Sequence, residues 1–172
     1  PIYEFQGDIT ETAGDGLMII FQEKSQTLHA TNAINAAVAI QRITAEIQGG
    51  LGAGEERIMI NIGINSGQAL VGFTKYEAVS GTRFTFTASG RTTIVAARLA
   101  DLATEGSILV STETMTRLRR PEGAVKNKFR FKSLGERRLK NIIRLETVFR
   151  VEGEAGDSEV SPDGKKGAPN AV

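Results

Sequence analysis

Two kinds of hydrophobic repeat follow one another along the first part of the chain, and each predicts an element. Ile9–Ala13 is β-prone and Leu17–Phe21 is fully apolar, with Gly14–Gly16 between them. The Asp-Gly pair in this connection is a strong hairpin signal, because both turn positions favour a positive φ. Apolar residues then recur at three- and four-residue spacing over Thr27–Ile47, which predicts a helix with one buried stripe. The stripe consists of Ala33, Ala36, Ile40, Ile43 and Ile47.

A period of two returns after a glycine-rich loop at Gly50–Gly54. Over Ile58–Asn65 four isoleucines alternate with other residues, which predicts a strand with all four on one face. A turn at Ser66-Gly67 leads into Gln68–Phe73, so we predict a second hairpin from these two strands. A loop is expected over Thr74–Gly81. Further strands are predicted over Arg83–Thr87, Ile108–Val110, Phe129–Leu134 and Leu145–Val151, and the last two are expected to form a hairpin. Helices are predicted over Thr92–Leu102 and Thr112–Leu118, and Ser111 is expected to cap the second helix.

Hairpins that alternate with helices predict an α+β fold. We expect a ferredoxin-like antiparallel sheet with helices on one face and a C-terminal β-hairpin. A ferredoxin-like core would start with one more strand and helix, which this chain lacks. Residues 1–151 form the predicted domain, and 152–172 are expected to be a disordered tail, because Gly, Ser, Pro, Asp and Lys dominate there without periodicity.

Composition narrows the chemistry. The 172 residues suffice for one domain, and without cysteine the chain has neither disulfides nor thiolate zinc sites. A single histidine, His29, excludes multi-histidine metal sites, and we interpret it as structural. The net charge is only +1, yet nine basic residues face two acidic ones over Lys126–Arg150. Such a stretch favours an anionic partner or forms a solvated strand face.

Four segments together resemble the class III adenylate/guanylate cyclase catalytic domain. Each motif is weak alone, but four in this order and at this spacing are specific. The segments are Gly7–Phe21, Ile62–Gly72, Phe86–Leu99 and Leu134–Lys140, within a resemblance that spans Gly7 to Val151.

The resemblance implies attack of a ribose 3′-hydroxyl on the α-phosphate of a nucleoside triphosphate, with release of pyrophosphate. Two Mg²⁺ or Mn²⁺ ions would assist, and Asp15 matches the family's second metal aspartate. Arg98 matches the arginine that stabilises charge on the transferring phosphate, and Lys140 the lysine that contacts the terminal phosphates. Outside the family context, each would be an ordinary surface residue.

Two further positions match the residues that select the purine. Glutamate at the position of Glu11 resembles guanine selection, because it accepts hydrogen bonds from the base. Thr87 is at the second position, where a hydroxyl both donates and accepts. ATP and GTP therefore both stay open as substrates.

Two departures from the family pattern bear on turnover. The family's other metal aspartate would lie on a strand upstream of Pro1, and neither Asp8 nor Glu11 is near enough to Asp15 to replace it. The family also has an asparagine four residues before the arginine, where this chain has Ile94. An apolar side chain cannot orient the ribose by hydrogen bonding.

The family acts as a dimer, with metals bound by one subunit and base and phosphates by the other. We therefore expect a homodimer or a complementing cyclase domain. The domain would be a cytoplasmic output module, with a sensor or membrane segment upstream in the parent protein. The first alternative is a degenerate cyclase fold that binds nucleotide or dimerises without catalysis. The second, a nucleic-acid binder, ranks last because its stacking candidates, Phe84, Phe86, Phe129 and Phe131, are expected in the core.

Overall fold

The computed structural model of the chain describes residues 1–22, 26–52, 54–118 and 129–154. The helices are the short 3-10 turn η1 (Tyr3–Phe5), α1 (Gln26–Gly49), α2 (Arg91–Leu102) and α3 (Thr112–Leu118). The strands are β1 (Gly7–Ala13), β2 (Gly16–Phe21), β3 (Ile62–Ile64), β4 (Leu70–Ala78), β5 (Gly81–Ser89), β6 (Ile108–Ser111), β7 (Phe129–Arg137) and β8 (Glu146–Glu154). The predicted α+β class is confirmed. The predicted tail falls outside the described residues, apart from its first three, which belong to β8.

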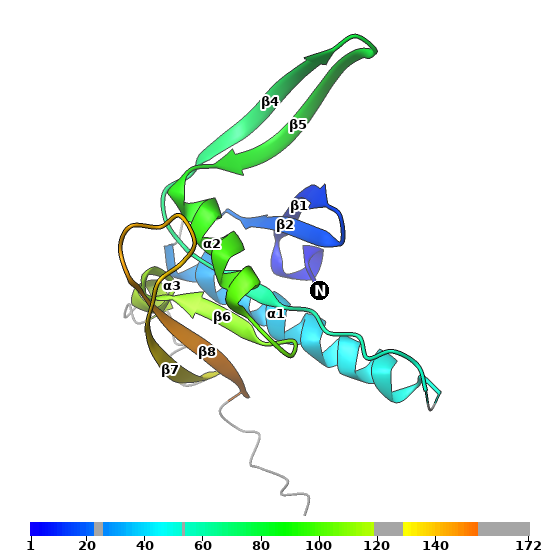
Figure 1. Cartoon of the computed structure of the whole chain (residues 1–172), viewed down its shortest axis with the longest axis vertical. Helices are drawn as coiled ribbons and strands as arrows, with labels where there is room; N and C mark the ends of the chain where they lie inside the picture. The colour runs from blue at the N-terminus through cyan, green and yellow to red at the C-terminus, as the bar shows by residue number, and fades with distance from the viewer. Residues whose placement is uncertain (23–25, 53, 119–128, 155–172) are drawn as a thin grey trace, which may run out of the picture.

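The central sheet has the strand order β3-β6-β8-β7. Its strands β6, β8 and β7 are labelled in Figure 1. β3 pairs with β6 in parallel, whereas β6–β8 and β7–β8 are antiparallel, so the sheet is mixed. The hairpins β1–β2 and β4–β5 form two separate two-stranded sheets. The predicted hairpin of β3 with β4 is therefore wrong. Local alternation cannot reveal that the partner of β3 lies more than forty residues further along the chain.

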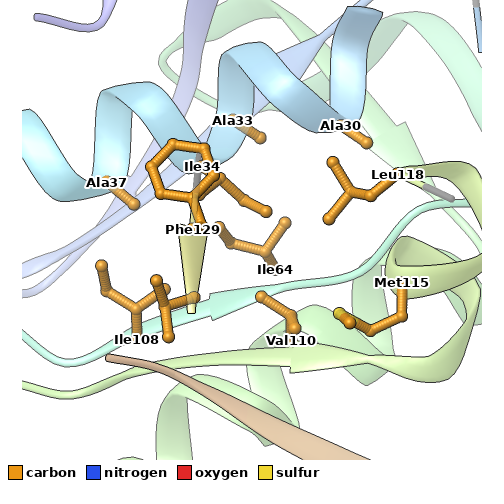
Figure 2. Packing of buried hydrophobic residues seen from close by; sticks show 11 residues of the cluster. Ala30, Ala33, Ile34, Ala37, Ile64, Ile108, Val110, Met115, Leu118 and Phe129 are labelled. Atoms are coloured by element: carbon orange, nitrogen blue, oxygen red, sulfur yellow. The ribbon is translucent and has the colours of Figure 1, made fainter. Parts of the chain in front are cut away.

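Helices cover both faces of this sheet, which corrects the expectation of helices on one face. Ile108 and Val110 pack with Ile34 of α1 in one buried cluster (Figure 2). Leu109, between them in the strand, packs with Val95 and Leu99 of α2 in a second cluster. Because successive side chains of a strand point to opposite faces, α1 and α2 lie on opposite sides of β6.

The predicted stripe of α1 is buried only in its first half. Ala33 and Ala36 are buried, Ile40 and Ile43 are half-buried, and Ile47 is exposed. The end of α1 extends past the sheet (Figure 1), so its apolar residues have no layer to pack against. The strand predicted over 58–65 is likewise reduced to β3, because β6 begins opposite Ile62.

The β4–β5 hairpin projects from the body as a long arm (Figure 1). Its register runs from Leu70 opposite Ser89 to Ala78 opposite Gly81, so the predicted loop over 74–81 is wrong. The arm gives no clear burial signal, because most of its side chains are exposed on both faces. Phe84, predicted in the core, is 63% exposed, whereas Phe129 is buried as predicted.

Gly63 of β3 lies against the backbone of α2. A Cβ at this position would be 2.2 Å from the Ala96 carbonyl oxygen and 2.3 Å from the Ala100 backbone nitrogen. Backbone atoms cannot move aside as side chains do, so only glycine permits this approach. α2 carries Arg98, and the fit at Gly63 therefore fixes how that helix sits on the sheet.

Replacement of Gly63 with alanine is expected to lower the free energy of unfolding by about 3 kcal/mol, the upper part of the usual range for overpacking. Gly72→Ala is the matched control, because an added Cβ at Gly72 meets nothing within 4 Å and its φ is not positive. Urea unfolding of both variants measures the difference. Equal midpoints would show that the contact of β3 with α2 is looser than described.

Candidate active site

Asp15 occupies the turn of the first hairpin. Ala13 pairs with Gly16, so the two turn residues are Gly14 and Asp15. Gly14 has a φ of +62°, whereas Asp15 does not have a positive φ. The Asp-Gly signal suggested that the turn depends on Gly16, which follows Asp15. The structure shows that it depends on Gly14, which precedes Asp15. Asp15 is exposed, and its carboxylate has no hydrogen bond or ion pair with any residue in the described ranges.

Glu11 and Thr87 lie on neighbouring strands. Glu11 follows an irregularity in β1, where the register shifts between Ile9 and Glu11 and Thr10 Oγ1 donates to the Met18 carbonyl at 3.3 Å. Glu11 is half-buried, and Thr87 of β5 is 9% exposed. β1 packs beside β5. The structure thus brings together the strands of both predicted purine selectors, although the sequence did not predict these strands as neighbours.

Arg98 lies on α2, whose inner face is formed by Val95 and Leu99. Its Nη1 donates to Asp101 Oδ2 at 2.7 Å. Its Nε is buried and has no hydrogen-bond partner in the described part of the chain. Ile94, one turn earlier, is 46% exposed, so an apolar side chain meets solvent where the family pattern has an amide.

Lys140 lies on the connection between β7 and β8. The flanking Leu139 is 3% exposed and packs in the cluster of Val95 and Leu99, with Ile142 beside it. The Ile142 amide donates to the Leu139 carbonyl at 3.1 Å, which closes a tight turn around Lys140. The turn therefore rests on the helix that carries Arg98. Lys140 itself is exposed and lines an open hollow with Arg138.

The sequence reasoning missed two polar contacts of α2. Asp101 is three residues after Arg98, a spacing that favours an ion pair on a helix and could have been noticed. Arg91 at the start of α2 pairs with Glu146 at the start of β8. No local pattern predicts that contact, because the two residues are 55 positions apart.

His29 of α1 is partly buried near α3. Burial, followed by the positive charge of Arg117, holds the pKa of His29 below its usual value of 6.5. The imidazole is therefore neutral at pH 7, and it has no place in the candidate active site.

Within the described ranges, no three Asp, Glu, His or Cys side chains gather as a metal site. Asp15 nevertheless fits a divalent cation as one ligand, because its carboxylate is a hard oxygen donor, exposed and free of competing cations. In the same residues, no helix is long and apolar enough to span a bilayer.

Comparison with known proteins agrees with this architecture. The family model described as the adenylate and guanylate cyclase catalytic domain matches residues 4–152. This chain therefore belongs to the adenylate and guanylate cyclase catalytic domain family. The comparison with curated protein sequences found no match.

Solved structures give the same fold. The adenylyl cyclase CyaB from P. aeruginosa is 24% identical with a TM-score of 0.71, over 87% of this chain and 73% of that one. The guanylate cyclase domain of RhGC from Catenaria anguillulae, solved with GTP, is 22% identical with a TM-score of 0.66, over 88% and 75%. A guanylyl cyclase domain from Blastocladiella emersonii, described as a non-canonical dimer, is 22% identical with a TM-score of 0.64, over 88% and 75%.

Proposed function

We propose that this domain converts a purine nucleoside triphosphate to its 3′,5′-cyclic nucleotide and pyrophosphate, at a site shared by two chains. The ribose 3′-oxygen bonds to the α-phosphorus, the bond from that phosphorus to pyrophosphate breaks, and the hydroxyl proton is lost. Divalent cations, when bound, lower the pKa of the hydroxyl and neutralise phosphate charge. The observation that carries the proposal is the packing of the Lys140 turn on α2, the helix of Arg98.

Each site residue has a role in this proposal. Asp15 of one chain supplies a metal ligand. Arg98 and Lys140 of the other chain contact the transferring and the terminal phosphates, and their charges stabilise the transition state. Glu11 and Thr87 bind the purine edge. The second metal aspartate is expected on a strand upstream of Pro1.

Dimerisation is supported by the arm. Phe73 is 75% exposed and Phe84 is 63% exposed. Phe73 lies directly opposite Phe86 in the register, and Phe84 is two residues before Phe86 in β5. Both exposed rings therefore lie on the same face of the β4–β5 arm. Exposed aromatic side chains of this kind mark association surfaces. The related Blastocladiella domain is described as a non-canonical dimer, which supports association of two chains but not the arrangement of a shared site, and the Catenaria domain is described as bound to GTP. We infer a homodimer or a complementing cyclase domain that acts in cytoplasmic signalling, under the control of an upstream sensor.

The proposal is tested with a chain that extends upstream of Pro1, incubated with Mn²⁺ and GTP or ATP. We expect cyclic nucleotide and pyrophosphate in equal amounts, and none after chelation of the metal. The exposed Ile94 favours the alternative, a cyclase fold that binds nucleotide without turnover. Triphosphate binding without product would support that alternative, and the absence of both would refute the proposal.

Substitution of Glu11 by lysine is expected to shift the ratio of GTP to ATP turnover toward ATP by about tenfold or more. A carboxylate accepts hydrogen bonds from guanine N1–H and its exocyclic amine, whereas an ammonium group can only donate, and each mismatched polar contact costs about 1–3 kcal/mol. Glu4→Lys, with the same change of charge in η1, is the control. An unchanged ratio in Glu11→Lys would remove Glu11 from the site.

A further inference from the structure

Arg98 is already paired with a carboxylate in the described conformation. Its Nη1 is engaged by Asp101 at 2.7 Å, and its Nε is buried without a partner. The Arg98 side chain is 29% exposed, whereas that of Asp101 is 63% exposed. The guanidinium group is therefore drawn along α2 toward the end of the helix.

A guanidinium grips a phosphate with two adjacent N–H groups, either Nε with one terminal nitrogen or both terminal nitrogens. The first edge is closed because Nε is buried, and at the second edge the Asp101 carboxylate occupies one of the two N–H groups of Nη1. The second N–H of Nη1 and both N–H groups of Nη2 are left, beside a carboxylate that has the same sign of charge as a phosphate. The pair with Asp101 thus opposes a two-point contact between Arg98 and a phosphate, because the carboxylate and the phosphate repel each other at the same guanidinium group.

We propose that Asp101 is a positioning residue, which holds Arg98 in a resting conformation and releases it when the transferring phosphate arrives. The inference rests on the proposed function, because it concerns the arginine of that site. The phosphate and the Asp101 carboxylate compete for the same guanidinium group. The pair is solvent-exposed on the side of Asp101, so its rupture costs little, and the restraint is a modest one.

The experiment compares Asp101→Asn with wild type in the chain extended upstream of Pro1. Asparagine keeps the shape of the side chain and removes the charge. We expect kcat/KM for the triphosphate to rise about two- to fivefold, the range that exposed ion pairs of this kind contribute. Glu113→Gln is the matched control, because it removes a similar helical ion pair, Arg117–Glu113 at 3.0 Å, and should leave kcat/KM unchanged.

A double-mutant cycle separates release of Arg98 from a general change in charge. In an Arg98→Gln background, Asp101→Asn should have no effect, because the residue through which it acts is gone. A persistent increase in that background would overturn the proposal. A decrease in kcat/KM in Asp101→Asn alone would also overturn it, since Asp101 would then orient Arg98 for catalysis.

Chemical modification gives a readout that does not depend on turnover. Phenylglyoxal should react with Arg98 about two- to fivefold faster in Asp101→Asn, at an unchanged rate for Arg117 in the same chain, as followed by peptide mass spectrometry. An unchanged rate at Arg98 refutes the restraint, whatever the activity. A different result would refute the proposed function and leave the restraint by Asp101 intact. In that case wild type neither turns over the triphosphate nor is protected by it from phenylglyoxal, while Arg98 still reacts faster in Asp101→Asn.

Discussion

Replacement of Ile94 with asparagine is expected to raise the rate of cyclic nucleotide formation by about 10- to 100-fold. Ile94 lies one turn before Arg98 on the same face of α2, and its side chain is 46% exposed. A polar group at this position would therefore be accessible to a nucleotide that binds beside Arg98. An amide can hold the ribose by hydrogen bonds, and correct placement of a reacting hydroxyl is worth up to about 100-fold. The present isoleucine can provide only apolar contact.

Ile94→Ala is the control for this gain. It shortens the side chain without adding a hydrogen-bonding group, so it should leave the rate low. The cost of asparagine to the helix is about 0.5 kcal/mol, too small to unfold α2. Equal rates for Ile94→Asn and wild type would mean that ribose placement does not limit this chain, and equal gains in both variants would point to steric relief instead.

The sequence predicted the local elements of the fold well. α2, α3 and the β7–β8 hairpin were found because each has a strong local signal, such as the apolar spacing of α2 and the cap on α3. Ser111 Oγ accepts a hydrogen bond from the Thr114 amide at 3.2 Å, as the predicted cap requires. These signals depend only on residues close together in the chain.

The pairing of strands was not predictable in the same way. The parallel contact of β3 with β6 joins residues far apart in the chain, and Gly63 had no visible meaning until α2 was found against it. The arm was missed because exposed strands lack the burial that alternation reports. The arrangement of the candidate site was not predictable from the sequence either. The family resemblance identified Arg98 and Lys140 separately. Only the packing in the structure shows that the turn with Lys140 lies against α2, the helix that carries Arg98.

Asp15→Asn and Arg98→Gln are each expected to lower cyclic nucleotide formation at least about 100-fold. Loss of the carboxylate removes a metal ligand, and loss of the guanidinium removes a charge that stabilises the transition state, an effect of about 100- to 1,000-fold for a single group. Neither substitution should change the fold, because Asp15 is exposed in a turn and the Arg98 ion pair is exposed on its Asp101 side. Circular dichroism and urea unfolding of both variants check this.

The most direct measurement of the shared site is complementation between these two variants. Co-expression in equal amounts gives mixed dimers in half of the population, and each mixed dimer has one site with both Asp15 and Arg98 intact. We therefore expect the mixture to recover about a quarter of wild-type activity, although each variant alone is at least about 100-fold less active than wild type. Activity that stays at the level of the single variants, while mixed dimers are shown to form, would contradict a site built from two chains.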